Sequence, residues 1–147
     1  MNTQNKLSRR QFAGRAVAAA ATVSIVPRHI IGKGQTPPSE TVTKAVIGVG
    51  GMGMGHLKNV NPKAKLVAVC DVDENHLKNA QKAGGKDVRA YKDFREVLEQ
   101  KDVDVVHVPT PPHWHALISI AAAKAGKDIW CEKPLSRTIY EGEKVVE

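Results

Sequence analysis

The sequence has few cysteines, few aromatic residues and no long apolar run. Among its 147 residues there are two cysteines, and the aromatic residues make up 4%. The lysines of residues 41–147 are scattered and are not interleaved with aromatic residues, which is typical of a solvated surface and not of a nucleic-acid interface. The apolar stretch at 16–26 has eleven residues, whereas a bilayer span needs ~20. The sequence therefore predicts neither a nucleic-acid partner nor a full transmembrane helix in this stretch.

Positive charge is concentrated at the start of the chain. The first forty residues carry six basic side chains and one acidic, a net of +5, whereas the other 107 carry sixteen and fourteen, a net of +2. The segment Ser8-Arg9-Arg10-Gln11-Phe12, followed by the short apolar stretch, is typical of a twin-arginine export signal. An arginine-rich disordered tail is the alternative interpretation.

We interpret residues 1–31 as this signal and residues 32–43 as a linker, because glycine, proline, serine and threonine are frequent there. No A-x-A cleavage site follows Val26, so the protein is expected in the periplasm, either released or tethered to the membrane by an uncleaved signal. The twin-arginine export machinery is a predicted partner. That route carries folded proteins, which suits a domain that takes up a cytoplasmic ligand before export.

A glycine-rich turn follows the first apolar run of the main domain. Residues 44–53 read Lys-Ala-Val-Ile-Gly-Val-Gly-Gly-Met-Gly, the pattern that joins a strand to a helix in dinucleotide-binding βαβ units. The first glycine would permit the tight turn, the second would let the backbone approach a pyrophosphate, and the third would let the helix pack close to the strand. The phosphates would lie at the helix N-terminus. A purely structural turn is the alternative. The candidate cofactor-binding residues of this loop are Gly48, Gly50, Gly51, Met52 and Gly53.

An acidic residue stands where such a unit needs one. Asp71 follows the second apolar run, 65–70, and lies eighteen residues after Gly53, close to the expected spacing of ~20. A carboxylate there accepts hydrogen bonds from ribose hydroxyls and repels a 2′-phosphate, which favours NAD over NADP. NADP is kept as the second cofactor option. The alternative role for Asp71 is the N-cap of the next helix.

Apolar runs alternate with helical stretches throughout residues 44–147. Because the runs lack polar alternation, they indicate a parallel sheet covered on both faces, and right-handed crossovers make it a doubly wound α/β (Rossmann) sheet. Capping signals support these limits at Asp93 with Glu96, at Thr138 with Glu141, and at Gly126. The expected strands are 44–49, 66–70, 88–90, 103–108 and 128–131, and the expected helices are 52–60, 74–83, 93–100 and 113–125.

The domain is expected to be incomplete at its C-terminal end. The helix opened by Thr138 reaches the last residue without a stop signal, and five strands are counted where the full fold has six. We therefore expect residues 44–147 to lack the last strand and a C-terminal domain. In this strand order Cys70 and Cys131 lie on the order of 14 Å apart, at roughly 4.8 Å per strand, beyond disulfide reach. Both are predicted to be small buried hydrophobic residues.

Two more segments follow strands at the carboxyl edge of the sheet, where ligands bind in this architecture. The first is Pro109-Thr110-Pro111-Pro112-His113-Trp114-His115, in which Thr110, Pro111 and His115 are candidate cofactor-binding residues. No metal site is predicted from His113 and His115, because helical positions i and i+2 point different ways and no third ligand is visible. Packing or capping is the alternative role for His115.

The second segment is Cys131-Glu132-Lys133-Pro134. A lysine at this edge, beside a nicotinamide, could polarise or protonate a substrate hydroxyl. Lys133 is therefore the candidate catalytic residue, and an exposed loop lysine is the alternative.

Together these segments resemble the Gfo/Idh/MocA oxidoreductases, the family of glucose–fructose oxidoreductase and inositol dehydrogenase. The resemblance covers residues 44–147 and is carried by the glycine loop and by residues 69–73, 110–115 and 125–134. It implies oxidation or reduction of sugars or cyclitols with NAD or NADP. It also implies that Lys133 lies near the nicotinamide, before a cis proline at Pro134, and that Glu132 shapes the nicotinamide site. A larger C-terminal domain would hold the other acid–base residues.

Three functions remain open at this point. The first is the nucleotide-binding domain of an exported oxidoreductase that transfers hydride between a nicotinamide cofactor and a sugar- or cyclitol-like alcohol, as a homo-oligomer when full length. The second is an NAD-dependent glycoside hydrolase of the same superfamily. The third is a non-catalytic dinucleotide-binding fragment.

Overall fold

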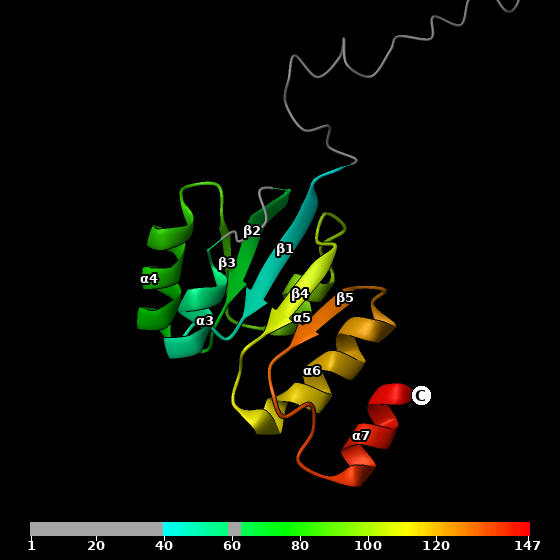
Figure 1. Cartoon of the computed structure of the whole chain (residues 1–147). Helices are drawn as coiled ribbons and strands as arrows, with labels where there is room; N and C mark the ends of the chain where they lie inside the picture. Colours follow the sequence, from blue (N-terminus) through cyan, green and yellow to red (C-terminus); the bar gives the residue numbers. More distant parts are fainter. Residues whose placement is uncertain (1–39, 59–62) are drawn as a thin grey trace, which may run out of the picture. The chain divides into compact units, whose positions relative to one another are not determined.

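The computed structural model describes residues 40–58 and 63–147. The predicted export signal at 1–31 and residues 32–39 of the predicted linker lie outside the described residues. The first strand begins at Val42, two residues before the predicted start of the domain. From there the chain forms one parallel sheet with helices on both faces (Figure 1).

The five strands of the described residues are all parallel, and their order in the sheet is β3-β2-β1-β4-β5. This is the doubly wound order, in which the chain moves outward from β1 in one direction and then in the other. The predicted fold class is therefore confirmed. The weak strand expected near 88–90 forms one edge of the sheet. The strands are β1 (Val42–Ile47), β2 (Ala64–Cys70), β3 (Arg89–Tyr91), β4 (Val105–Val108) and β5 (Asp128–Cys131).

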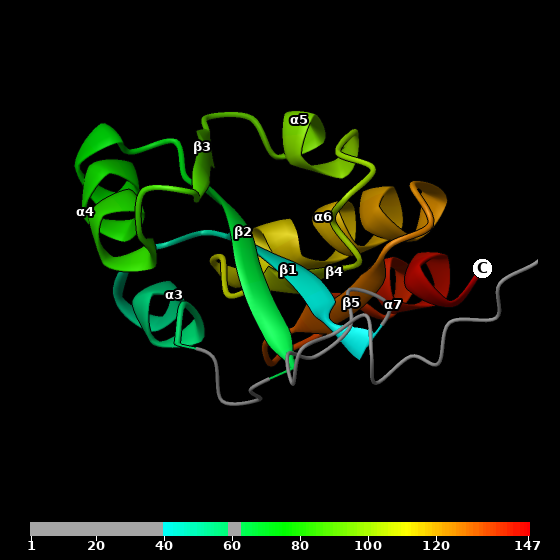
Figure 2. The same cartoon turned by 90° about the horizontal axis from the view of Figure 1, so that it is seen from above.

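The helices cover both faces of the sheet. Figure 2 shows α5 and α6 on one face, and α3 and α4 on the other. One buried cluster joins α5 and α6 to the sheet, and a second cluster lies beneath α4 and the residue that follows α3. Because β1 is buried on both sides, its run Ala45–Ile47 is apolar without alternation. The helices are α3 (Gly51–His56), α4 (Glu74–Gly84), α5 (Phe94–Leu98), α6 (Pro112–Lys124) and α7 (Ile139–Val146).

The predicted helix limits hold at three places. Asp93 is the N-cap of α5, and its carboxylate accepts the N–H of Arg95 at 2.9 Å. Thr138 caps α7 through a 3.1 Å bond from the N–H of Glu141. Gly126 has a φ of +70° and ends α6, where its N–H donates to the Ala123 carbonyl.

One of these signals was wrong in detail. The Glu141 carboxylate accepts the N–H of Arg137 at 2.7 Å, not that of Thr138. The Asp93 carboxylate also accepts from the Arg95 guanidinium at 3.2 Å. The helix expected at 52–60 ends at His56. The N–H of Leu57 donates to the Met54 carbonyl at 3.4 Å, a three-residue bond in place of the four-residue bond of an α-helix, and residues 59 and 60 lie outside the described residues.

The cysteines and the last strand complete the frame of the site. Cys70 is buried and Cys131 half-buried, and both thiols are free, so burial of Cys131 was overestimated. Burial and the nearby acidic groups, Asp71 first, raise the pKa of the Cys70 thiol to about 12. β5 forms the other edge of the sheet, which leaves Trp130 60% exposed. The C-terminal helix α7 packs beside α6 (Figure 1).

Candidate cofactor-binding site

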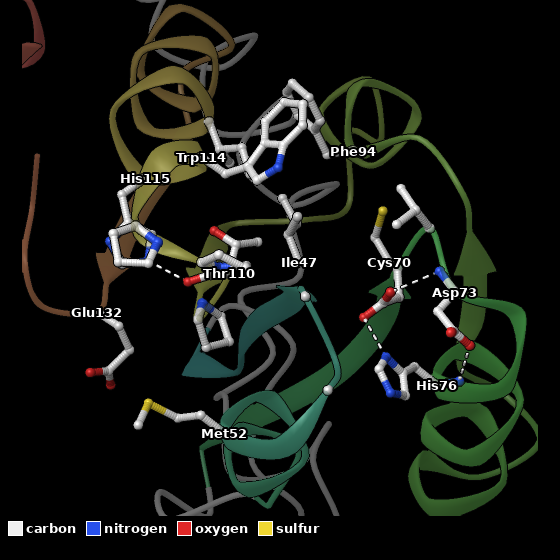
Figure 3. Close-up of a pocket in the computed structure, with 18 of the residues that line it drawn as sticks. Ile47, Met52, Cys70, Asp73, His76, Phe94, Thr110, Trp114, His115 and Glu132 are labelled. Atoms are coloured by element: carbon white, nitrogen blue, oxygen red, sulfur yellow. Dashed lines mark hydrogen bonds and ion pairs between the residues drawn. The ribbon is translucent and has the colours of Figure 1, made fainter. Parts of the chain in front are cut away.

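A cavity of about 640 Å³ opens along the carboxyl edge of the sheet, where β1 is flanked by β2 and β4. It lies where the strand order reverses, the position of ligands in doubly wound sheets. Ten of the eleven candidate residues line it, and Gly53 is the exception. Figure 3 shows side chains from all these segments around one space. The ten are Gly48, Gly50, Gly51, Met52, Asp71, Thr110, Pro111, His115, Glu132 and Lys133.

Two glycines are required by the packing of the loop itself. Gly48 has a φ of +92°, and a Cβ there would stand 2.7 Å from Cγ2 of Thr110. A Cβ on Gly53 would stand 1.8 Å from the carbonyl oxygen of Gly48. These contacts account for glycine at the tight turn and at the helix–strand crossing without any ligand.

The other two glycines of the loop are not required by packing. A Cβ on Gly50 would meet only His76, at an ordinary 3.5 Å, and a Cβ on Gly51 would have no described atom within 4 Å. Both residues line the cavity. No side chain of the described residues caps α3, which leaves its first N–H groups open to acceptor atoms of a ligand. Packing among the described residues therefore does not account for glycine at these two positions.

Asp71 braces the glycine loop. Its Oδ2 accepts the N–H of Val49 at 2.8 Å, and its Oδ1 accepts the N–H of Asp73 at 2.9 Å. The Nδ1 of His76 also lies 3.7 Å from Oδ2. Because Oδ1 has a further lone pair, the side chain keeps acceptor capacity at the cavity that it lines. The N-cap of α4 is Asp73, whose pKa is lowered by the N–H groups of His76 and Asn75. The alternative that Asp71 is that N-cap was therefore wrong.

His115 lines the cavity with 1% of its surface exposed. Its Nε2 is 2.7 Å from the Thr110 carbonyl oxygen and its Nδ1 is 2.7 Å from the Pro134 carbonyl oxygen. The ring thus joins two loops of the site, and both of its nitrogens are engaged by main-chain groups (Figure 3). A direct bond to a cofactor would have to replace one of these, so the geometry favours a packing role.

Thr110 presents an unused polar atom. Its Oγ1 is buried and has no hydrogen-bond partner among the described residues. A buried hydroxyl is costly to leave unpaired, and this residue lines the cavity. A polar group of a bound molecule would satisfy it.

Asp71 follows β2, whereas Glu132 and Lys133 follow β5, on the opposite side of β1 and β4 in the sheet order. The N–H of Glu132 donates to the Val108 carbonyl at 3.3 Å, which fixes the loop to β4. The Lys133–Pro134 peptide bond is cis, as the resemblance implied. Lys133 is exposed and lines the cavity.

The sequence analysis missed the apolar wall of the cavity. Phe94 and Trp114 meet edge to face with their ring centroids 6.4 Å apart, and both line the cavity (Figure 3). Such a wall suits a flat aromatic group. Only an isolated aromatic residue at the start of each helix, α5 and α6, could have indicated it.

Within residues 40–58 and 63–147, no three His, Cys, Asp or Glu side chains gather as metal ligands. No helix in these same ranges has the length and apolar character of a membrane span.

A glycine turn, an acid after the second strand and an apolar cavity at the reversal of a parallel sheet define a dinucleotide-binding Rossmann domain. The chain belongs to the Gfo/Idh/MocA family, described as an oxidoreductase family with an NAD-binding Rossmann fold, which it matches over residues 42–147. The cofactor of this domain is accordingly NAD. The open glycines, the acceptor capacity of Asp71 and the unpaired Thr110 hydroxyl fit that molecule.

Three similar proteins illustrate the range of the family. Myo-inositol 2-dehydrogenase of Thermotoga maritima is 38% identical over 104 residues, which are 69% of this chain and 31% of that protein. A glycosyl hydrolase family 109 protein of Shewanella pealeana is 33% identical over 126 residues, 76% of this chain and 26% of that protein. The crystal structure of myo-inositol dehydrogenase from Lactobacillus casei, in complex with NAD(H) and myo-inositol, is 32% identical with a TM-score of 0.68, over 72% of this chain and 32% of that one. The chain thus spans about a third of the length of such relatives.

Proposed function

We propose that this chain is the cofactor domain of an exported oxidoreductase that transfers hydride between NAD and a sugar- or cyclitol-like alcohol. The single observation that carries the cofactor half is the contrast among the glycines. Gly48 and Gly53 are needed by the fold, whereas Gly50 and Gly51 leave open space on the cavity. The similarity to inositol dehydrogenases supports the substrate class.

The two ends of the cavity suggest how the cofactor lies. Asp71 would accept hydrogen bonds from the adenosine ribose, with Phe94 and Trp114 beside the adenine. Gly50, Gly51 and Met52 would face the pyrophosphate. Glu132 and Lys133, which follow β5, would then lie at the nicotinamide end, on the opposite side of β1 from Asp71, which follows β2.

NAD supplies the hydride acceptor. The residues of this chain would orient NAD and transfer a proton to or from the substrate oxygen. Lys133 reaches the cavity from a loop fixed to β4 by Glu132. In carbonyl reduction its ammonium would donate a proton to the substrate oxygen, and in alcohol oxidation its neutral amine would accept the hydroxyl proton. His115 would keep the Thr110 and Pro134 loops in register.

The cofactor proposal is tested by titrating NAD+ into the wild-type chain and into Gly50→Val while unfolding is followed by circular dichroism. A bound ligand raises the unfolding temperature. We expect NAD+ to raise it in the wild type only, with both proteins equally stable without NAD+. Equal stabilisation of the two proteins, or of neither, would overturn the proposal.

A glycoside hydrolase is the second candidate, favoured by the similarity to the family 109 protein over 76% of this chain. An assay of the full-length protein that carries this domain distinguishes the two candidate functions. Inositols and pyranoses with NAD+ would yield NADH from a dehydrogenase, whereas nitrophenyl glycosides would be cleaved without net NADH by a hydrolase. Cleavage without NADH would replace the first proposal by the second.

The organisation of the rest of the protein is proposed on sequence grounds. Residues 1–31 would direct export through the twin-arginine machinery, and residues 32–43 would connect them to the domain at 44–147. The protein would act in the periplasm, either released or tethered by an uncleaved signal, and as a homo-oligomer. A dinucleotide-binding fragment without catalysis would be the outcome if the chain binds NAD+ and no reaction accompanies it.

A further inference from the structure

Two histidines outside the cavity are connected to Glu132 by successive side-chain contacts. His56 is the last residue of α3, and its Nε2 lies 3.1 Å from Oε1 of Glu132. Its Nδ1 lies 3.2 Å from Nδ1 of His107, on β4. His56 and Glu132 are mostly buried, with side-chain exposures of 16% and 24%. Neither histidine lines the cavity, whereas Glu132 does.

We propose that His107 and His56 form a hydrogen-bond chain that fixes the Glu132 carboxylate at the nicotinamide end of the cavity. Both histidines are then positioning residues. The expected effect on NAD binding rests on the proposed function, whereas the hydrogen-bond chain itself does not. The chain connects three segments that are distant in sequence: the glycine helix α3, the central strand β4 and the loop after β5.

The hydrogens of this chain can be assigned from its ends. Ionised Glu132 only accepts, so His56 must carry its hydrogen on Nε2. When His56 is neutral, its Nδ1 carries no hydrogen and accepts from Nδ1–H of His107. His107 therefore adopts the tautomer with hydrogen on Nδ1, leaving Nε2 bare.

The surroundings hold this hydrogen-bond chain in place. The His107 ring stacks on Trp130 with centroids 5.6 Å apart and an interplanar angle of 20°. Lys44 is 4% exposed, and its Nζ donates to the carbonyls of His56 and Lys58 at 2.8 and 3.0 Å, which anchors the end of α3. Burial, and then the charge of Lys44, lower the pKa of His107 to about 4, so this ring is neutral near pH 7.

The consequence for binding is specific to one end of the ligand. NAD+ and ADP-ribose share the adenosine and both phosphates, but only NAD+ carries the nicotinamide. If the chain orients Glu132 toward that ring, its loss weakens NAD+ binding and spares ADP-ribose. A general loosening of the glycine loop would weaken both ligands equally.

The geometry is tested directly by long-range ¹H–¹⁵N NMR of the imidazoles in the 147-residue chain at pH 7.5. We expect a protonated Nδ1 in His107 and a protonated Nε2 in His56, with His107→Phe used for assignment. A His107 ring protonated on Nε2 would contradict the proposed hydrogen-bond chain. This measurement needs no cofactor, so it stands whether or not NAD binds.

The consequence is tested by calorimetric titration of NAD+ and ADP-ribose into four proteins. His56→Leu should weaken NAD+ binding about tenfold, the order expected for one hydrogen bond to a charged group, and leave ADP-ribose within about twofold. His56→Gln, which keeps an N–H donor for Glu132, should recover most of the loss. His113→Leu, an exposed histidine outside the cavity, is the matched control and should match the wild type.

Equal weakening of both ligands in His56→Leu, or no weakening, would refute the positioning role. A wild type that binds neither ligand would instead refute the proposed function. If His56→Leu does not fold, His107→Phe takes its place, since it keeps the stack on Trp130 and removes only the hydrogen bond.

Discussion

Gly53 lies against the carbonyl oxygen of Gly48, so close that a Cβ at position 53 would stand 1.8 Å from it. Both atoms are fixed by the backbone, and no rotamer relieves the clash. We expect Gly53→Ala to lower the free energy of unfolding by about 3 kcal/mol, measured by urea denaturation. Gly51→Ala is the control, because its Cβ would meet no described atom within 4 Å. Similar midpoints for the two variants would contradict this account of the loop.

Asp71 should decide between the two cofactors. Asp71→Asn removes the charge that repels a 2′-phosphate, so the ratio of the NADP+ to the NAD+ dissociation constant should fall about tenfold. The variant should also be less stable by about 1 kcal/mol, because one N–H of Val49 or Asp73 loses its carboxylate partner. Both constants come from calorimetric titration. Asp87→Asn, at an exposed site outside the cavity, should leave the ratio unchanged, and an unchanged ratio in Asp71→Asn would contradict the assignment.

His107 should make stability depend on pH. Its pKa is lowered from 6.5 to about 4 in the folded state, so between these values the unfolded chain binds the extra proton and stability falls as the pH falls. The wild type should lose about 1–2 kcal/mol more than His107→Phe between pH 7 and pH 5, a value reduced for the solvent that reaches this half-buried ring.

The measurement for His107 is urea denaturation at the two pH values. Carboxylates such as Asp93, whose pKa is lowered chiefly by the Arg95 N–H, titrate alike in both proteins and cancel in the difference. His113→Phe, at an exposed site, should retain the wild-type dependence. Identical pH slopes in the wild type and in His107→Phe would show that the ring is not held neutral.

Lys133 should affect the reaction more than binding. In the protein that carries this domain at full length, Lys133→Met should lower kcat by roughly 10²–10⁴-fold, the range for loss of a general acid–base group, with the NAD+ dissociation constant within about threefold. Steady-state NADH formation and calorimetry measure the two quantities. Lys124→Met, at an exposed position near the end of α6, is the matched control. An unaltered kcat in Lys133→Met would remove this residue from the chemistry.

The leader should depend on its arginine pair. A fusion of residues 1–43 to a folded reporter should reach the periplasm of a bacterium with the twin-arginine machinery, and Arg9→Lys with Arg10→Lys should keep at least about tenfold more in the cytoplasm, since a receptor reads the motif. Cell fractionation measures the distribution. Arg28→Lys, outside the motif, should export normally. Periplasmic reporter in the double variant would identify these residues as a basic tail.

The parts that sequence could predict are those with a local cause. The turn at Gly48 and the close approach at Gly53 follow from spacing, because each glycine acts within one βαβ unit. The place of Asp71 follows from the length of the intervening helix and strand. Its bond to the Val49 N–H was not predictable, since it depends on how closely β2 brings the side chain to the loop.

The parts that sequence could not predict join distant segments. His56, His107 and Glu132 meet because α3, β4 and the end of β5 converge on one face, and no spacing along the chain encodes that meeting. The burial of His115 between two carbonyls is of the same kind. The extent of α3 was overestimated because apolar periodicity does not reveal where a tighter turn replaces the last helical one.

The hydrogen bond from the Val49 N–H to Asp71 fixes the glycine loop to the end of β2 in the absence of a ligand. A preorganised binding site loses little conformational entropy when its ligand binds. The affinity for NAD is then governed by the contacts that NAD itself makes. The affinities of ligands that lack one end of NAD should give the contribution of each contact in turn.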